Sequence, residues 1–333
     1  MMLQAPILAL LLADGLSLLL LVPASLFALQ LLRHWNPSSG HARQLRLENR
    51  THLIATVLVL VFLAQLLTLP LFVHTVDRMA LQIAGAMCAV GTLNANAWGF
   101  PALLLRITLV FLAAAWLVLH RMDVRAPDYP LIRAKYRLLL LVLPLAGLAA
   151  GLQLAFFLQL DPDVITSCCG SLFSHGGESV AAHMAAVPAL PAMIALYGSL
   201  GLALAAAVFY LRRRRGLLAF GILTALNFPV AIAAIVAFLS LYVYEHPLHH
   251  CPFCLLQPEY GRIGYALYLP LFGATALGIG LALTAAFAQR ESLRCVLARA
   301  APPLVLIAAA GLASFAALAA WISWQSNLIL LGY

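Results

Sequence analysis

The residues best suited to chemistry in this sequence surround a Cys-Pro-Phe-Cys motif. Cys251 and Cys254 are separated by two residues, and His249 and His250 directly precede them. On the first turn of a helix, this spacing places both sulfurs on one face, close enough to bond. The N–H groups and the dipole of a helix N-terminus stabilise a thiolate, and the histidines can add positive charge or accept a proton. The motif therefore predicts a reactive, exchangeable disulfide.

The same segment is also a potential metal site. Imidazole and thiolate together form a ligand set that suits zinc or copper(I). The candidate ligands are His249, His250, Cys251 and Cys254. A structural disulfide is the third interpretation of the motif. The residues of the segment do not by themselves decide among redox, metal-binding and structural roles.

The elements that carry these residues are predicted to be membrane-spanning helices. Apolar residues make up 64% of the 333 positions, and charged residues make up 9%, whereas soluble domains carry about a quarter charged residues. The apolar positions fall in blocks of about 20 or more, long enough to cross a bilayer as helices. We therefore expect an all-α fold, with residues 1–333 forming a single transmembrane domain of about eight helices. The expected spans are Pro6–Leu32, His52–Val73, Pro101–His120, Leu138–Leu160, Pro188–Leu211, Leu217–Tyr242, Ile263–Ala288 and Pro303–Trp324.

The distribution of basic residues predicts the orientation of these spans. Of the 19 Lys and Arg residues, 16 lie in the connections after the first, third, fifth and seventh spans. The opposite connections hold only Arg78 and Arg262. By the positive-inside rule, both termini are then extracytoplasmic. The basic residues are explained by topology and sit in short connections without a folded basic domain, so no nucleic-acid partner is expected.

This orientation gathers five of the six cysteines on the extracytoplasmic side. Cys88 lies in the first extracytoplasmic connection, Cys168–Cys169 in the second, and Cys251 and Cys254 in the third, whereas Cys295 is cytoplasmic. An oxidising compartment favours disulfides. Five is an odd number, so at least one of these thiols is left for a reaction, a metal ion or another chain.

Residues 251–257, Cys-Pro-Phe-Cys-Leu-Leu-Gln, resemble the C-x-x-C-x-x-Q/E stretch of the DsbB family. These membrane enzymes, like the related VKOR family, pass electrons from thiols to a quinone and hold four helices, with C-x-x-C at a helix mouth beside the quinone. The family's basic residue directly after this stretch is replaced by Pro258, and the nearest arginine is Arg262. The remaining extracytoplasmic cysteines precede the motif, which is nearer to the VKOR order.

The resemblance implies a role for each residue. Cys251 would be the exposed nucleophile, and Cys254 would be its partner nearer the quinone. Cys168–Cys169 or Cys88 would relay electrons from a substrate. Gln257 and Arg262 would contact the quinone, with Arg262 polarising a carbonyl group.

Two charged residues lie inside predicted spans. Asp14 lies in the first span and Arg106 in the third, at similar depths from the extracytoplasmic side. Intramembrane charges are costly and often functional, so the two side chains are candidates for an ion pair. That pair would serve a proton path to a quinone, a transport path or a structural contact.

Together these patterns predict an integral membrane thiol–disulfide oxidoreductase that exchanges electrons between extracytoplasmic thiols and membrane quinone. Two other classes remain open: a copper- or zinc-binding module for metal delivery or cofactor maturation, and a structural subunit of a respiratory or transport complex. The expected partners are the lipid bilayer and an extracytoplasmic thiol protein or metallochaperone. The expected location is a bacterial inner membrane, with the cysteine connections facing the periplasm.

Overall fold

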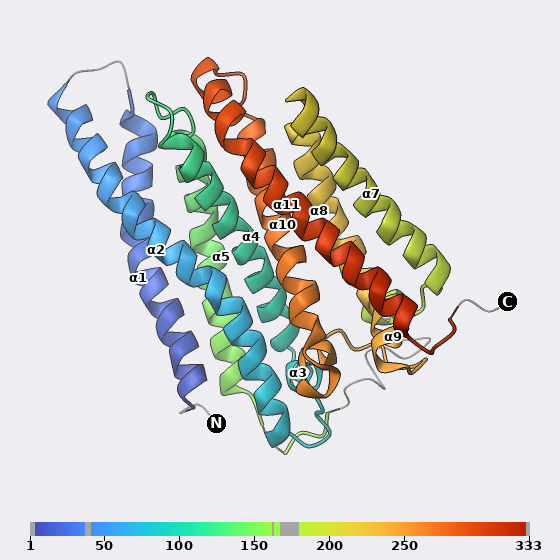
Figure 1. Cartoon of the computed structure of the whole chain (residues 1–333). Helices are drawn as coiled ribbons and strands as arrows, with labels where there is room; N and C mark the ends of the chain where they lie inside the picture. The colour runs from blue at the N-terminus through green and yellow to red at the C-terminus, as the bar shows by residue number, and fades with distance from the viewer. Residues whose placement is uncertain (1–3, 37–40, 162, 167–179, 331–333) are drawn as a thin grey trace. The chain divides into compact units, whose positions relative to one another are not determined.

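A computed structural model describes residues 4–36, 41–161, 163–166 and 180–330, and all regular secondary structure in these ranges is helical (Figure 1). Eight of the helical segments so described are long and apolar enough to cross a membrane, which confirms the all-α polytopic fold. Large apolar side chains remain on the helix surfaces, for example Leu12 at 72% and Leu67 at 69% exposure. In an integral membrane protein such side chains contact lipid.

The bounds of the helices follow the predicted spans in order. The long segments are α1 (Ala5–His34), α2 (Ala42–Met79) with the 3₁₀ turn η1 (Ala80–Gln82), α4 (Gly99–Asp123), α5 (Ile132–Leu158), α7 (Ala189–Arg213), α8 (Leu217–Ala234) continued by the π-turn η2 (Ile235–Leu239) and α9 (Ser240–Tyr244), α10 (Ile263–Ala285) and α11 (Glu291–Gln325). The short elements are α3 (Ala89–Leu93), α6 (Val180–Ala185) and the 3₁₀ turns η3 (Cys254–Leu256) and η4 (Pro258–Tyr260).

Two helices begin well before the predicted positions. α2 starts at Ala42, not His52, and α11 starts at Glu291, not Pro303. Hydropathy locates only the apolar part of a helix, and a polar extension that buries one apolar stripe stays helical beyond it. In α11 this stripe is formed by Leu293, Leu297 and Ala301, all buried at four-residue spacing.

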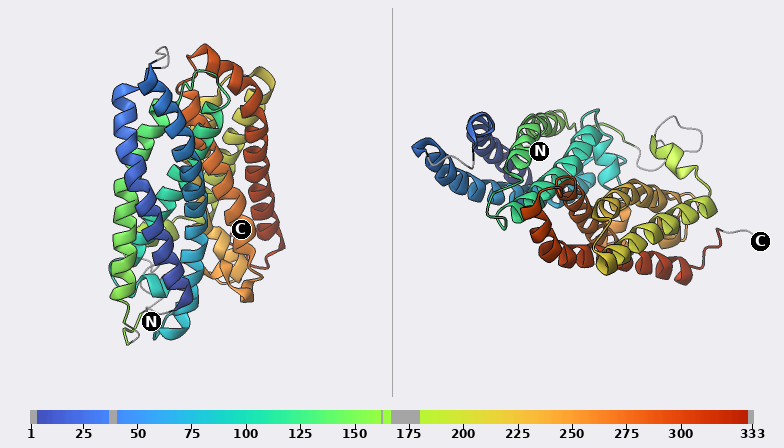
Figure 2. Two further views of the ribbon diagram at one scale, coloured as in Figure 1. Left: turned by 90° about the vertical axis from the view of Figure 1, so that its left-hand side faces the viewer. Right: turned by 90° about the horizontal axis from the view of Figure 1, so that it is seen from above.

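The chain divides into two compact units, each of which is described by itself. Unit 1 consists of residues Met1–Thr75, Asn96–Leu160 and Leu283–Ala300. It contains α1, most of α2, α4 and α5, which lie side by side in both views of Figure 2. Its core is apolar and aromatic, with the Phe62 and Trp116 rings 4.8 Å apart. These four helices therefore bury a common face.

A buried ion pair joins α4 and α5 of unit 1. The Lys135 Nζ atom lies 2.6 Å from Asp123 Oδ2, and both side chains are at most 1% exposed. Asp123 Oδ1 also accepts a hydrogen bond from the backbone N–H of Leu131. The sequence places Lys135 in a polar connection, but it lies in the first turn of α5. A charge buried there needs its partner, because desolvation is costly.

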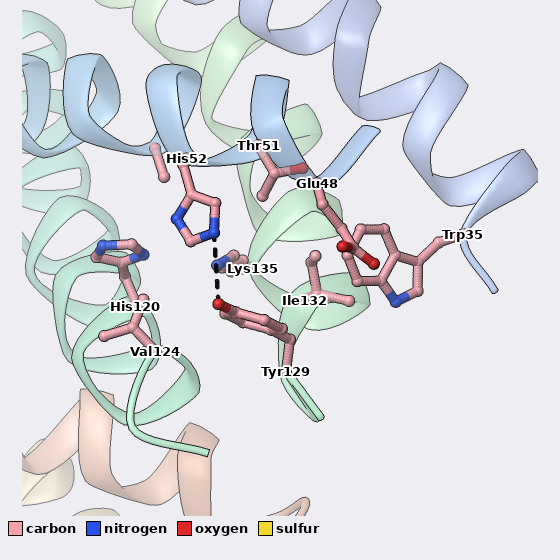
Figure 3. Close-up of a pocket in the computed structure, with 10 residues that line it drawn as sticks. Trp35, Glu48, Thr51, His52, His120, Val124, Tyr129, Ile132 and Lys135 are labelled. Atoms are coloured by element: carbon pink, nitrogen blue, oxygen red, sulfur yellow. Dashed lines mark hydrogen bonds between the residues drawn. The ribbon is translucent and has the colours of Figure 1, made fainter. Parts of the chain in front are cut away.

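A small cavity of about 20 Å³ adjoins this pair, enough for one water molecule. His52, His120, Tyr129 and Lys135 are among its lining residues (Figure 3). The Tyr129 hydroxyl lies 3.4 Å from His52 Nε2, and the His120 ring stacks on Trp116. None of the lining residues is a cysteine, so this cavity is separate from the thiol chemistry that the sequence predicts.

Replacing Lys135 with Met removes the charge that compensates Asp123 while keeping an extended side chain. We expect a loss of about 3–5 kcal/mol in the free energy of unfolding, as for other broken buried pairs. Thermal unfolding in detergent micelles measures this loss as a lower midpoint. Arg137→Met, at an exposed position of the same helix, is the control and should leave the midpoint almost unchanged. Equal midpoints for the two variants would contradict the buried pair.

Candidate functional site

Among the residues that the structure describes, unit 2 contains three of the predicted cysteines. It consists of residues Val76–Ala95, Asp161–Ala282 and Ala301–Tyr333. Cys88 directly precedes α3. Cys251 and Cys254 lie in the segment between α9 and α10. The fold thus has to bring together two segments that are far apart in the chain.

The three sulfurs form a compact buried cluster. The Sγ atoms of Cys88, Cys251 and Cys254 all lie within 4.8 Å of one another, and those of Cys88 and Cys251 are 3.4 Å apart. The side chains are 0%, 0% and 3% exposed, in that order. A disulfide bond is about 2.0 Å long, so the recorded arrangement is one of thiols in contact. We call these three residues the thiol cluster.

The sequence predicts that the motif lies at the start of a helix, and this prediction is wrong. Cys251 and the two following residues are irregular, Cys254 begins the 3₁₀ turn η3, and α10 begins only at Ile263. Gly261 and Arg262 adopt positive φ angles of 61° and 54°, which a continuous helix does not allow. The dipole of α10 therefore does not act directly on Cys251. Burial and neighbouring side chains define the environment of the thiols.

Two tyrosines hold the backbone of the motif. The Tyr244 hydroxyl donates a hydrogen bond to the carbonyl oxygen of Cys251 at 2.5 Å, and the Tyr268 hydroxyl donates one to the carbonyl oxygen of Pro252 at 2.7 Å. Carbonyl groups in an irregular, buried segment have no helical partner and need such donors. Because Tyr244 belongs to α9 and Tyr268 to α10, the two flanking helices together fix the motif.

A second set of bonds fixes Cys88 relative to the motif. The Gln257 side-chain amide donates to the carbonyl oxygen of Met87 at 2.9 Å. The backbone N–H of Ala89 donates to Asp77 Oδ1 at 3.1 Å. Both neighbours of Cys88 are therefore anchored. Gln257, predicted from the resemblance to contact a quinone, links the two cysteine-bearing segments, whereas Arg262 is exposed.

The two histidines of the motif have other contacts. His250 Nδ1 bonds the carbonyl oxygen of Val236, in the π-turn η2, at 2.8 Å. The His249 ring stacks on Tyr244 with the ring centroids 4.0 Å apart. Within the described ranges, the one group of three or more potential metal ligands at close spacing contains neither of them. This group contains Cys88 together with Cys251 and Cys254, and the metal-ligand role predicted for the histidines stays a prediction.

The segment before Cys168 runs along the segment that carries Cys88. The backbone N–H of Thr166 donates to the carbonyl oxygen of Ala84 at 2.9 Å. Gly85 adopts a φ of 79°, and a Cβ atom there would lie 2.1 Å from the Thr166 carbonyl oxygen. Only glycine permits this approach. Cys168 and Cys169, the predicted relay, lie outside the described residues.

Asp14 and Arg106 meet in unit 1, as predicted from their depths in the membrane. Arg106 Nη2 donates to Asp14 Oδ2, and Arg106 Nε donates to Gln153 Oε1 at 2.8 Å. The Gln153 amide donates back to Asp14 at 2.9 Å. These contacts join α1, α4 and α5. No pattern in the sequence indicates that Gln153 takes part in these contacts. The predicted quinone contacts of Asp14 and Arg106 stay predictions.

No family model, curated protein or solved structure matches this chain. The function therefore has to be inferred from the geometry and chemistry of the thiol cluster.

Oxidative cross-linking tests the proximity of the cysteines directly. In a Cys254→Ser variant, which removes the competing partner, mild oxidation with diamide should link Cys88 to Cys251. We expect this link because the two Sγ atoms are 3.4 Å apart, although the residues are 163 positions apart in the chain. Mass spectrometry of the linked peptides measures the product. Cys295, which is exposed, is the internal control and should not be linked to either residue; absence of the Cys88–Cys251 peptide would contradict the cluster.

The packing of α10 against the motif is tested by a single methyl group. In Gly264→Ala the new Cβ atom would lie 2.9 Å from the backbone of Leu255, next to Cys254. We expect the shift of this backbone to reduce the yield of the cross-link severalfold. Gly273→Ala in the same helix, where nothing lies within 4 Å of the added Cβ, is the matched control. Equal yields in the two variants would show that this contact does not position the motif relative to Cys88.

Proposed function

We propose that this protein is an integral membrane thiol–disulfide oxidoreductase whose thiol cluster passes electrons to membrane quinone. The observation that carries the proposal is the mutual proximity of the three sulfurs, all within 4.8 Å. One disulfide can occupy only two of them, so a third thiol always lies next to the bond. That arrangement suits exchange chemistry more than structural bridging.

The reaction proceeds by movement of a disulfide within the cluster. A thiolate of Cys88 attacks Cys251 in a Cys251–Cys254 disulfide, a Cys88–Cys251 bond forms, and Cys254 leaves as a thiolate that takes up a proton. Extracytoplasmic thiols then reduce the Cys88–Cys251 disulfide by two electrons and two protons, which restores the thiols of the cluster. In the oxidising half-reaction, the Cys251 and Cys254 thiols lose two electrons and two protons and form a disulfide. The quinone gains the same two electrons and two protons and becomes a quinol.

Burial of the cluster restricts which oxidant reaches it. With at most 3% of each cysteine exposed, a folded protein partner does not touch the sulfurs directly. A small, membrane-soluble oxidant suits such a site, and the resemblance of residues 251–257 to DsbB-like enzymes independently suggests quinone. The relay through Cys168 and Cys169 to an extracytoplasmic thiol protein remains part of the proposal, supported by the position of Thr166 beside Ala84.

A groove in unit 2 has a lining that suits a flat apolar ring such as that of a quinone. It has a volume of about 230 Å³, and its lining includes Tyr242, Tyr260 and Trp321. Aromatic walls favour stacking with a planar ligand. The Tyr260 ring packs 4.4 Å from Tyr244, whose hydroxyl donates to the Cys251 carbonyl oxygen. The groove is therefore connected to the thiol cluster through two tyrosine rings.

The positive-inside pattern supports an extracytoplasmic position for the motif segment, and we propose a bacterial inner membrane as the location. In that location the thiols would face an oxidising compartment. The cluster would thus link the periplasmic pool of protein thiols to the quinone pool of the membrane.

The proposal is tested with reduced protein in detergent micelles and a short-chain quinone. We expect Cys251 and Cys254 to become resistant to alkylation within minutes, with formation of one quinol per disulfide, because the disulfide and the quinol form together. Peptide mass spectrometry and quinol absorbance are the two measurements. Cys251→Ser should abolish quinol formation, whereas Cys295→Ser should leave it unchanged. Thiol labelling that does not respond to quinone would overturn the proposed function.

A further inference from the structure

We propose that the reduced thiol cluster is also a binding site for a single copper(I) ion, held by Cys88, Cys251 and Cys254. This site differs from the ligand set that the sequence suggests, because Cys88 replaces the two histidines of the motif. The binding does not require the quinone reaction, since it uses the thiols in their reduced form and involves no electron transfer.

The distances between the sulfurs fit a three-coordinate ion. Three metal–thiolate bonds of about 2.3 Å in one plane would place the sulfurs about 4.0 Å apart. All three pairs in the cluster are within 4.8 Å, and the Cys88–Cys251 pair, at 3.4 Å, has to open by only a few tenths of an ångström. Small rotations of the side chains supply this change without moving the helices.

The donor set selects the metal. Thiolates are soft ligands that favour copper(I) and zinc over magnesium, calcium or manganese. Structural zinc sites are almost always four-coordinate, whereas the cluster among the described residues supplies three ligands and no histidine. A three-coordinate thiolate site satisfies copper(I). The burial of the sulfurs, at 0%, 0% and 3% exposure, also shields the bound ion from water and dissolved oxidants.

Copper binding and disulfide formation exclude each other. On binding, the S–H bond of a ligating cysteine breaks, an S–Cu bond forms, and the proton passes to water. Copper stays in the +1 state and no electrons are transferred. Because both lone-pair donation to copper and S–S bonding use the same sulfur, a copper-loaded cluster does not react with quinone. Copper(I) would therefore lock the cluster in the reduced state.

The test uses the full chain, reduced and free of oxygen, in a background in which Cys168, Cys169 and Cys295 are all serine. Copper(I) buffered with bathocuproine disulfonate is the probe, and competition gives the affinity and the stoichiometry. We expect one copper ion per chain. Cys88→Ser, Cys251→Ser and Cys254→Ser should each weaken binding roughly tenfold or more. His249→Phe, which keeps an aromatic ring beside Tyr244 but removes both ring nitrogens, should stay close to the parent.

A second measurement needs no change in the cluster. In the same background, bound copper(I) should protect all three cysteines from a small alkylating reagent, and peptide mass spectrometry reads each position separately. Unprotected Cys88, undiminished affinity in Cys88→Ser, loss of binding in His249→Phe, or stoichiometric uptake of zinc in preference to copper(I) would each overturn the inference. Quinone-driven oxidation without copper binding rejects this inference alone, and copper binding without oxidation by quinone rejects the proposed function alone.

Discussion

The need to satisfy backbone carbonyl groups in a buried, irregular segment governs the arrangement of the thiols. Cys251 and Pro252 lie outside the helices and turns, and an unsatisfied buried carbonyl is costly. The hydroxyl groups of Tyr244 and Tyr268 meet this need for Cys251 and Pro252. Because the two donors come from rigid helices on either side, the same bonds that satisfy the backbone also determine where the sulfurs lie.

The π-turn in the sixth spanning segment serves the same end. Its extra residue disturbs the regular hydrogen bonding of a helix, as π-turns at functional sites often do. In this chain the carbonyl oxygen of Val236 bonds His250, the residue before Cys251. A local irregularity in a membrane helix is thereby used as an anchor for the motif. Because His250 directly precedes Cys251, its bond to Val236 also helps to position that cysteine.

The two units use buried polar groups differently. In unit 1, the Asp14–Arg106–Gln153 contacts and the Asp123–Lys135 pair join helices, and each charge has its partner close by, as the low dielectric of a membrane protein demands. In unit 2, the thiol cluster is uncharged until it reacts and therefore tolerates burial without a counter-ion. This difference suits a structural role in the first case and a reactive one in the second.

The sequence by itself determined the class of fold and the number and order of the spans, because hydropathy is a property of a single segment. It also made Asp14 and Arg106 candidates for an ion pair from their similar depths, and the structure brings them together. The sequence also located the Cys-Pro-Phe-Cys motif, but it wrongly placed the motif at a helix start. It also assigned the polar first turns of α2 and α11 to loops. Only the tertiary structure decided that Cys88 joins the motif, that Gln257 links the two segments, and that Gln153 bonds both Arg106 and Asp14. These contacts join residues far apart in the chain, and no periodicity or local spacing encodes which of them will meet.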